Sequence, residues 1–216
     1  MQKEMMQEQK QHLIDVWKSH GIIWDEQLIA AFRAVPRENF VPREYKKYTY
    51  DDSALPLVKG QTISQPTTVM IMTQALEVKP GMKVLEIGAG SGYQSAVLSV
   101  MVGKQGMIYT VEIEKEVCAI ARRNLKEYKN VKIVEGDGSL GFQEAAPFDR
   151  CIITAACPSI PQPVIDQLKE GGIVVAPVGS VYVQKMVKGV KKGNVLETES
   201  LGDFVFVKLQ GKYGFK

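Results

Sequence analysis

The run VLEIGAGSGY (84–93) decides the fold of this chain, because a short apolar stretch leads directly into a glycine-rich turn. Val84 to Ile87 has the composition of a buried strand, and a helical pattern follows Gly92. Glycines in such a turn let the backbone bend tightly and approach a ligand without a Cβ in the way. The helix that follows presents free backbone N–H groups. The run therefore predicts a nucleotide-type site at the carboxyl edge of a sheet.

The glycine spacing indicates which nucleotide the turn binds. A dinucleotide fingerprint reads G-x-G-x-x-G, but the sixth position counted from Gly88 is Tyr93, and counted from Gly90 it is Ser95. The G-x-G-x-G spacing of Gly88, Gly90 and Gly92 instead resembles the S-adenosylmethionine loop of class I methyltransferases. The alternative is a strand–helix turn with spare glycines and no ligand.

On both sides of this loop, short apolar runs alternate with helical patterns. The apolar runs lie at 82–88, 107–113, 131–136, 148–156 and 171–179, and the helical patterns at 66–77, 92–102, 115–127, 139–145 and 161–169. This alternation predicts an α/β fold, doubly wound, with a mostly parallel Rossmann-like sheet and helices on both faces.

The two flanking segments have a different character. Residues 1–59 show helical spacing of apolar residues, with Asp25 as the expected N-cap of the second helix. Residues 181–216 contain strand patterns joined by Lys/Gly-rich turns, which predicts antiparallel strands at one edge of the sheet. We expect one domain over 1–216, with residues 60–180 as its cofactor-binding core.

Composition excludes several classes of protein. The 216 residues carry a net charge of only +3, which gives no strong case for nucleic-acid or membrane binding. No apolar run is long enough to span a bilayer, and the polar first ten residues do not predict a signal peptide. Three cysteines without a Cys-x-x-Cys pair, and two histidines, predict a reduced cytoplasmic protein without a metal site.

Three acidic residues stand at the ends of successive predicted strands. Glu112, about twenty residues past the glycine loop, can accept hydrogen bonds from both ribose hydroxyls. Asp137 can accept from the adenine amino group, and Gly138 lets the base lie close to the backbone. Glu86 is expected near the methionine end of the cofactor, with a solvated strand-end acid as the alternative.

The sequence resembles the protein-L-isoaspartate (D-aspartate) O-methyltransferase family from about residue 13 to 215. The matching segments are VPRENFVP (35–42), GQTISQP (60–66), VLEIGAGSGYQSA (84–96), EGDGSLGFQEAAPFD (135–149), ITAACPSIP (153–161), QLKEGGIVVAPVG (167–179) and FVFVKL (204–209). GQTISQP is the specific one, because generic class I methyltransferases lack it.

The resemblance implies methyl transfer from S-adenosylmethionine to the α-carboxylate of L-isoaspartyl residues in damaged proteins and peptides, with S-adenosylhomocysteine as product. D-aspartyl residues are a second candidate substrate. The ester then collapses to a succinimide, and repeated cycles restore aspartate. Carried over by position, the catalytic serine is Ser64, and the cofactor residues are Gly88, Gly90, Gly92, Glu112, Asp137 and Gly138. We expect a monomer without nucleic-acid or membrane partners.

The residues around Ser64 allow two interpretations. Ser64 precedes Pro66 and a helical pattern, so spacing alone favours a helix N-cap, whereas the resemblance favours a hydroxyl that orients the substrate carboxylate. Thr62, Ile63 and Thr67 are expected to shape the substrate site, with core or capping roles as their alternatives.

The reaction itself explains why the sequence shows no Ser/His/Asp or Cys/His set, because a carboxylate is already ionised at neutral pH and needs no general base. Two competing functions remain open at this point. One is a class I methyltransferase acting on RNA or a small molecule, and the other is a binding module without catalysis.

Overall fold

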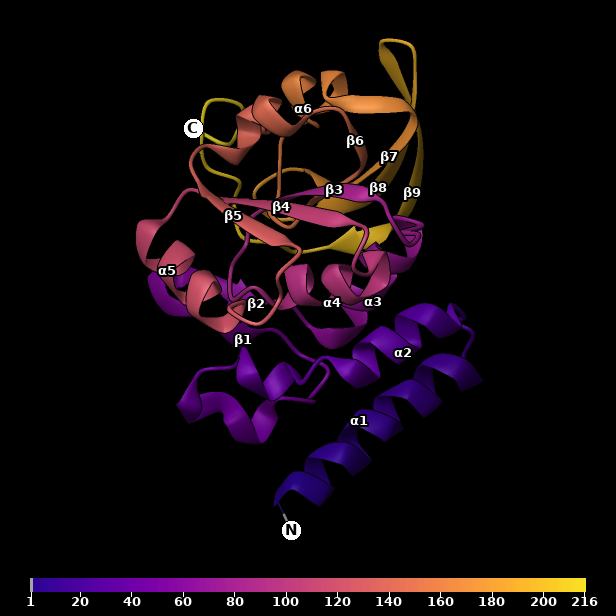
Figure 1. Cartoon of the computed structure of the whole chain (residues 1–216), viewed down its shortest axis with the longest axis vertical. Helices are drawn as coiled ribbons and strands as arrows, with labels where there is room; N and C mark the ends of the chain where they lie inside the picture. Colours follow the sequence, from indigo (N-terminus) through magenta and orange to yellow (C-terminus); the bar gives the residue numbers. More distant parts are fainter. Residues whose placement is uncertain (1) are drawn as a thin grey trace.

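The computed structural model describes residues 2–216, with side chains from residue 4, as a seven-stranded sheet between layers of helices (Figure 1). The strand order is β5-β4-β3-β6-β7-β8-β9. These strands are β3 (Lys83–Ile87), β4 (Met107–Glu112), β5 (Val131–Glu135), β6 (Phe148–Ile153), β7 (Leu168–Gly179), β8 (Gln184–Lys192) and β9 (Val195–Phe204). The first five pair in parallel, and β8 and β9 join antiparallel at the β7 side. The predicted doubly wound sheet with antiparallel edge strands is confirmed.

The central strands are buried on both faces because each lies between two apolar clusters. In β3, Val84 belongs to one cluster, whereas its neighbour Leu85 belongs to the other, as the alternation of side chains along a strand requires. The main helices are α3 (Pro66–Ala75), α4 (Tyr93–Val102), α5 (Lys115–Asn124) and α6 (Gln162–Asp166). Helix α4 is buried almost all round, because it lies between the sheet and the N-terminal helices.

The N-terminal segment adds two helices, α1 (Gln2–Ser19) and α2 (Glu26–Ala34), below α3 and α4 in Figure 1. Trp17 and Phe32 are fully buried between them, with ring centroids 4.8 Å apart in an edge-to-face arrangement. Helix α2 packs on α3 and α4. The N-terminal helices therefore share the apolar cluster on one face of the sheet.

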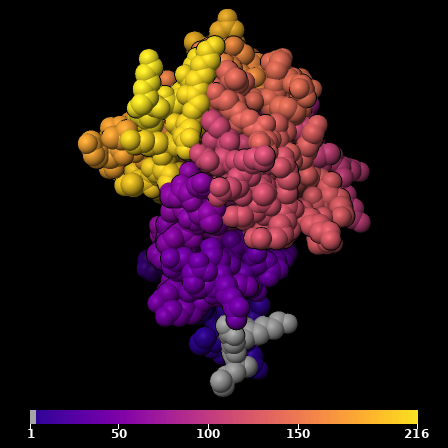
Figure 2. Space-filling view, turned by 90° about the vertical axis from the view of Figure 1, so that its left-hand side faces the viewer, coloured from indigo at the N-terminus to yellow at the C-terminus, as the bar shows by residue number. Residues whose placement is uncertain are grey.

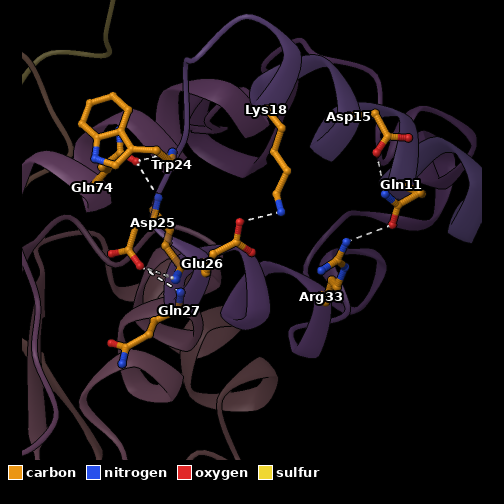
Figure 3. A network of polar contacts seen from close by, with 10 residues as sticks. Gln11, Asp15, Lys18, Trp24, Asp25, Glu26, Gln27, Arg33 and Gln74 are labelled. Atoms are coloured by element: carbon orange, nitrogen blue, oxygen red, sulfur yellow. Dashed lines mark hydrogen bonds and ion pairs between the residues drawn. The ribbon is translucent and has the colours of Figure 1, made fainter.

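The turn between α1 and α2 is held by polar contacts that Figure 3 shows. Asp25 caps α2 as predicted, with its side chain accepting hydrogen bonds from the backbone of the first turn. Gln74 of α3 accepts hydrogen bonds from the backbone N–H groups of Trp24 (2.9 Å) and Asp25 (3.2 Å). Lys18 and Glu26 form an exposed ion pair. The turn is thereby tied to α3, the helix that begins two residues after Ser64.

Short elements connect α2 to α3 and carry the residues around Ser64. Strands β1 (Leu55–Pro56) and β2 (Thr62–Ile63) form a small antiparallel pair. Three 3-10 turns precede or separate them, namely η1 (Arg37–Asn39), η2 (Arg43–Tyr48) and η3 (Val58–Gly60). Helix α3 starts at Pro66, where a missing N–H costs nothing.

Two predicted helices differ from the structure. Residues 139–145 form two 3-10 turns, η4 (Gly138–Leu140) and η5 (Gln143–Ala145), because Asp137 caps a single turn that ends at Gly141, whose φ is +70°. The helix expected over 161–169 is only α6, and β7 begins at Leu168 rather than residue 171. The buried Gln167 ends α6 because its side-chain amide bonds to the backbone of Leu140 (2.8 Å) and Phe142 (2.6 Å).

After β9 the chain crosses the carboxyl edge of the sheet, and we call residues 205–216 the C-terminal strap. Leu209 N–H donates to the Ala156 carbonyl (2.7 Å), and Lys212 N–H donates to the Asp137 carboxylate (2.8 Å). Figure 2 shows this yellow segment against the salmon-coloured residues around 130–150. Only strands were predicted here, so the strap is a finding of the structure. None of the described helices combines the length and apolarity needed to span a bilayer.

Candidate functional site

A cavity lies at the carboxyl ends of β3, β4 and β6, where the predicted cofactor loop leaves the sheet. Its walls come from four stretches of chain, namely residues 61–64, 87–91, 111–113 and 207–210, with further side chains from α3 and α4. Strand order places β3 between β4 and β6, so the cavity sits where the order of the parallel strands reverses, from β3-β4-β5 on one side to β6-β7 on the other. The glycine loop, GQTISQP and the strap therefore meet at one place.

Two of the three loop glycines are required by the packing beneath the loop. A Cβ on Gly88 would lie 2.5 Å from the Thr154 hydroxyl oxygen, and one on Gly92 would lie 2.8 Å from the Leu125 side chain. Gly92 is also the N-cap of α4, with a φ of +89°. These two residues shape the loop, although Gly92 does not itself line the cavity.

Gly90 differs, because the space in front of it is open. A Cβ there would meet only the Thr62 carbonyl oxygen, at 3.9 Å, and the residue lines the cavity. Its N–H donates to the Glu112 carboxylate (3.0 Å). The second Glu112 oxygen accepts from Glu114 N–H (3.1 Å), and the side chain is 6% exposed toward the cavity. Each carboxylate oxygen can accept two hydrogen bonds, so Glu112 keeps acceptor capacity for a ligand.

Of the two residues predicted to lie near the adenine, Asp137 and Gly138, only Gly138 lines the cavity. Gly138 lines the cavity, and a Cβ there would lie 2.6 Å from the Ile87 side chain, so glycine is needed for packing on the sheet. Asp137 does not line the cavity. One of its oxygens accepts from Ser139 N–H (2.9 Å) and Ser139 Oγ (2.6 Å), and the other accepts from Lys212 N–H (2.8 Å). Asp137 thus fixes the cavity wall, and its adenine contact stays a prediction.

Glu86 lies under the loop rather than in the cavity. The side chain is fully buried, and one carboxylate oxygen accepts a hydrogen bond from Ser95. The other oxygen and the buried Thr110 hydroxyl have no hydrogen-bond partner among the described residues. Burial raises the pKa of Glu86 to about 8, and the hydrogen bond from Ser95 opposes this shift. Glu86 therefore does not line the cavity, and its predicted position near the methionine end of the cofactor stays a prediction.

The position of Ser64 in the structure bears on the two interpretations, a helix cap or a hydroxyl that binds the substrate. It is half-buried and lines the cavity, and its hydroxyl has no hydrogen-bond partner in the described part of the chain. The N-cap of α3 is Gln65, without a side-chain capping bond. Asp52 instead accepts a hydrogen bond from Thr67 N–H in the first turn (2.9 Å). The capping alternative for Ser64 is not supported, and its hydroxyl is free to bind a ligand.

The neighbours of Ser64 fall into two groups. Thr62 and Ile63 line the cavity, as expected for residues that shape a substrate site. Thr67 does not line this cavity, and its hydroxyl instead donates to Asp52 (2.6 Å) and accepts from the indole N–H of Trp17 (2.7 Å). The geometry favours a structural role for Thr67 at the junction of α1 and α3.

A second cavity adjoins the first and shares Thr62 and Ser64 with it. Its far wall is formed by residues 203–206 and Val183. Val205 is 73% exposed and Val183 is 51% exposed, so this wall is an open apolar surface. Ser64 therefore stands at the junction between the loop cavity and an open groove.

Several lining residues were missed by sequence reasoning. Tyr93 was counted only as the residue that breaks a dinucleotide fingerprint, yet it lines the loop cavity from the start of α4. Residues 207–210 line the cavity from the strap. FVFVKL (204–209) marked this region as a segment of the family resemblance, but no periodic pattern indicated that it crosses the sheet edge.

Comparison with known proteins gives a consistent result. A model of the protein-L-isoaspartate(D-aspartate) O-methyltransferase family matches residues 8–214. The chain is similar to the protein-L-isoaspartate O-methyltransferases of Hyperthermus butylicus, 42% identical over 99% of this chain and 93% of that one, and of Dictyoglomus thermophilum, 44% identical over 96% and 93%.

Solved structures agree. A protein-L-isoaspartate O-methyltransferase superposes with a TM-score of 0.86 and 32% identity, covering 95% of this chain and 67% of that one. A second structure, from Plasmodium falciparum and in complex with S-adenosyl-L-homocysteine, has a TM-score of 0.81 at 24% identity, covering 92% and 97%, and supports the fold. The chain therefore belongs to the protein-L-isoaspartate(D-aspartate) O-methyltransferase family.

Proposed function

We propose that this protein transfers the methyl group of S-adenosylmethionine to the α-carboxylate of L-isoaspartyl residues in damaged proteins and peptides. The observation that carries the proposal is the unpartnered Ser64 hydroxyl at the junction of the two cavities. One cavity is bounded by the glycine loop, and the other is an open groove. A cofactor and a polypeptide can then meet at Ser64 from opposite sides.

The residues of the loop cavity fit the cofactor. Gly90 leaves the space that a Cβ would fill, and Glu112 offers spare acceptor capacity beside it for the ribose hydroxyls. Gly138 and the strap close the other side. When bound, S-adenosylmethionine supplies an electrophilic methyl group whose leaving group is a neutral thioether.

The chain's own task is to align the acceptor and exclude water. The Ser64 hydroxyl can donate a hydrogen bond to one oxygen of the substrate carboxylate and so hold the other toward the loop cavity. No proton has to be removed, since a carboxyl with a pKa near 4 is already ionised. Consistent with this, neither histidine nor cysteine occurs among the described residues that line the two cavities. Orientation of this kind supplies a large share of the rate, and a misplacement of about 1 Å can cost about a hundredfold.

The open groove supports a polypeptide substrate rather than a free small molecule. Its exposed apolar wall at Val183 and Val205 can contact residues next to the isoaspartyl group. D-aspartyl residues present the same carboxylate and remain a second candidate. We further propose that the protein acts as a cytoplasmic monomer without nucleic-acid or membrane partners; sedimentation equilibrium on the purified chain tests its oligomeric state.

Methyl incorporation from labelled S-adenosylmethionine tests the function. An isoaspartyl peptide, its aspartyl twin and bulk RNA are offered in parallel, and we expect labelling of the isoaspartyl peptide alone. Labelling of RNA in place of the peptide would support the competing class I methyltransferase, and no labelling with normal cofactor binding would support a binding module. The Ser64→Ala protein should lose about a hundredfold in turnover while binding cofactor normally. Near-normal turnover of that variant would remove Ser64 from the catalytic role.

A further inference from the structure

The segment VPRENFVP (35–42) buries an arginine directly behind Ser64. Arg37 begins the 3-10 turn η1 and is 0% exposed, which makes it one of the largest fully buried side chains of the described structure. It lines neither cavity. Arginine is protonated at neutral pH, so a positive charge lies one layer behind the site.

Two of the guanidinium nitrogens hold backbone carbonyls from separate segments. Nη2 donates to the Ser64 carbonyl (2.8 Å) and Nε donates to the Thr49 carbonyl (2.9 Å). The Cζ atom lies 4.8 Å from the ring centroid of Tyr93, which itself lines the loop cavity. Arg37 therefore fixes the backbone of Ser64 relative to the first turn of α4.

The guanidinium of Arg37 makes no direct contact with a carboxylate of the described residues. Arg37 forms no ion pair in the described part of the protein, and its Nη1 has no hydrogen-bond partner. Burial lowers its pKa, and the nearby Tyr93, Tyr50 and Asp52 side chains oppose that shift. The Asp52 carboxylate hydrogen-bonds to Thr67 and not to Arg37, so its attraction acts on the guanidinium only from a distance. Unpaired buried charges are costly, so one that persists beside a site calls for an explanation.

We propose that Arg37 is a positioning residue that holds Ser64 in place and supplies the buried positive charge that selects a carboxylate at this site. The proposal rests on the proposed function, in which the acceptor at Ser64 is an anion. Only Ser64, whose carbonyl Arg37 binds, separates an anion at the Ser64 hydroxyl from the guanidinium. The protein interior screens the attraction between these two charges less than water does. The competing explanation is that Arg37 has a purely structural role and only holds η1 to the backbone of Thr49 and Ser64.

Ligand binding separates these explanations. With the protein saturated in S-adenosylhomocysteine, the dissociation constants of an isoaspartyl peptide and of its α-carboxamide analogue are measured by calorimetry. We expect the wild type to prefer the carboxylate by about tenfold or more. Arg37→Met should lose most of that preference through weaker binding of the carboxylate peptide alone. Arg37→Lys keeps the charge but not the two-carbonyl contact, so it should keep the preference and lose turnover.

A second buried cation, Lys10 of α1, provides the matched control. Lys10 is 3% exposed and donates to the carbonyls of Arg33 (2.7 Å) and Val35 (3.3 Å), but it does not contact Ser64. Lys10→Met should lower the melting temperature without changing KM, kcat or the carboxylate preference. A folded Arg37→Met protein that behaves in the same way would overturn the proposal.

A measurement on the wild type keeps the proposal testable if the Arg37 variants do not fold. Lys208 also lines the loop cavity, but it is exposed, so its charge is screened by salt. The carboxylate preference should change less than about threefold between about 0.05 and 0.5 M KCl if the buried charge sets it. A preference that disappears in high salt would assign selection to Lys208 and refute the role of Arg37. If the wild type methylates no isoaspartyl peptide at all, the proposed function fails instead, which is a distinct outcome.

Discussion

Replacing Glu86 with glutamine should remove a pH dependence of stability that the buried carboxyl imposes on the fold. Burial raises the pKa of Glu86 from its usual 4.5 to about 8. Below pH 4.5 the group is protonated in both the folded and the unfolded chain. Between pH 4.5 and 8 the folded chain retains a proton that the unfolded chain has lost, so the free energy of unfolding falls as pH rises.

The size of the effect follows from the shift. At about 1.4 kcal/mol per pH unit, the destabilisation reaches about 3 kcal/mol at pH 7 and about 5 kcal/mol at pH 8, where the folded group also ionises and the loss is complete. Glutamine is neutral throughout and keeps the shape of the side chain. Its amide oxygen can accept the hydrogen bond that Ser95 donates to Glu86. Glu86→Gln should therefore match the wild type near pH 4.5 and exceed its stability increasingly toward pH 8.

Urea unfolding of the cofactor-free protein at half-unit steps from pH 4.5 to 8.5 measures both curves. The expected result is a divergence of the two free energies of unfolding with rising pH, with equal m-values. Parallel curves would show that Glu86 is ionised in the folded state at neutral pH, and the reasoning from burial would be wrong.

Three further outcomes are expected. Glu112→Ala should weaken S-adenosylmethionine binding by about 1.5–3 kcal/mol, the usual scale for lost hydrogen bonds to a charged group; unchanged affinity in calorimetry would remove Glu112 from the ribose role. Gly90→Val should abolish cofactor binding, whereas Gly81→Val, also at positive φ with open space but outside the cavity, should affect only stability; equal binding by both variants would contradict the loop assignment. The three cysteines are buried and burial raises the pKa of each thiol, so their joint replacement by alanine should leave turnover of the folded protein within about threefold; a folded, cofactor-bound but inactive variant would disprove this.

The sheet could be predicted because its signals are local. A run such as 84–93 contains the strand, the turn and the start of the helix in consecutive residues, and the structure has β3 and α4 within a residue or two of the expected bounds. The same holds for Asp25, whose capping bonds reach only two and three residues along the chain. Geometry of this kind depends only on residues close in sequence, so the sequence alone can predict it.

The remaining features depend on contacts between distant residues. Residues 139–145 have a helical pattern, but the buried Gln167 binds the backbone there and holds it in turns. Whether Ser64 caps α3 was decided by Asp52, which lies fifteen residues before Thr67 and accepts the hydrogen bond of its N–H in the first turn. Asp137 is held outside the cavity in part by Lys212 of the strap, whereas its neighbour Gly138 lines the cavity. No pattern near residue 137 could indicate this contact.

The strap also links cofactor affinity to the folding of the whole chain. Residues 207–210 complete the wall of the loop cavity, and the contacts of Lys212 and Tyr213 with residues 137 and 139 span more than seventy positions. Contacts of such long range form late, because their loop-closure entropy is large. A chain folded only as far as β6 would thus hold the glycine loop but lack one wall of the cavity, and it should bind the cofactor poorly. Cofactor present at a hundred times its dissociation constant should then stabilise the complete fold by about 2.7 kcal/mol, while a partly folded chain gains almost nothing from it.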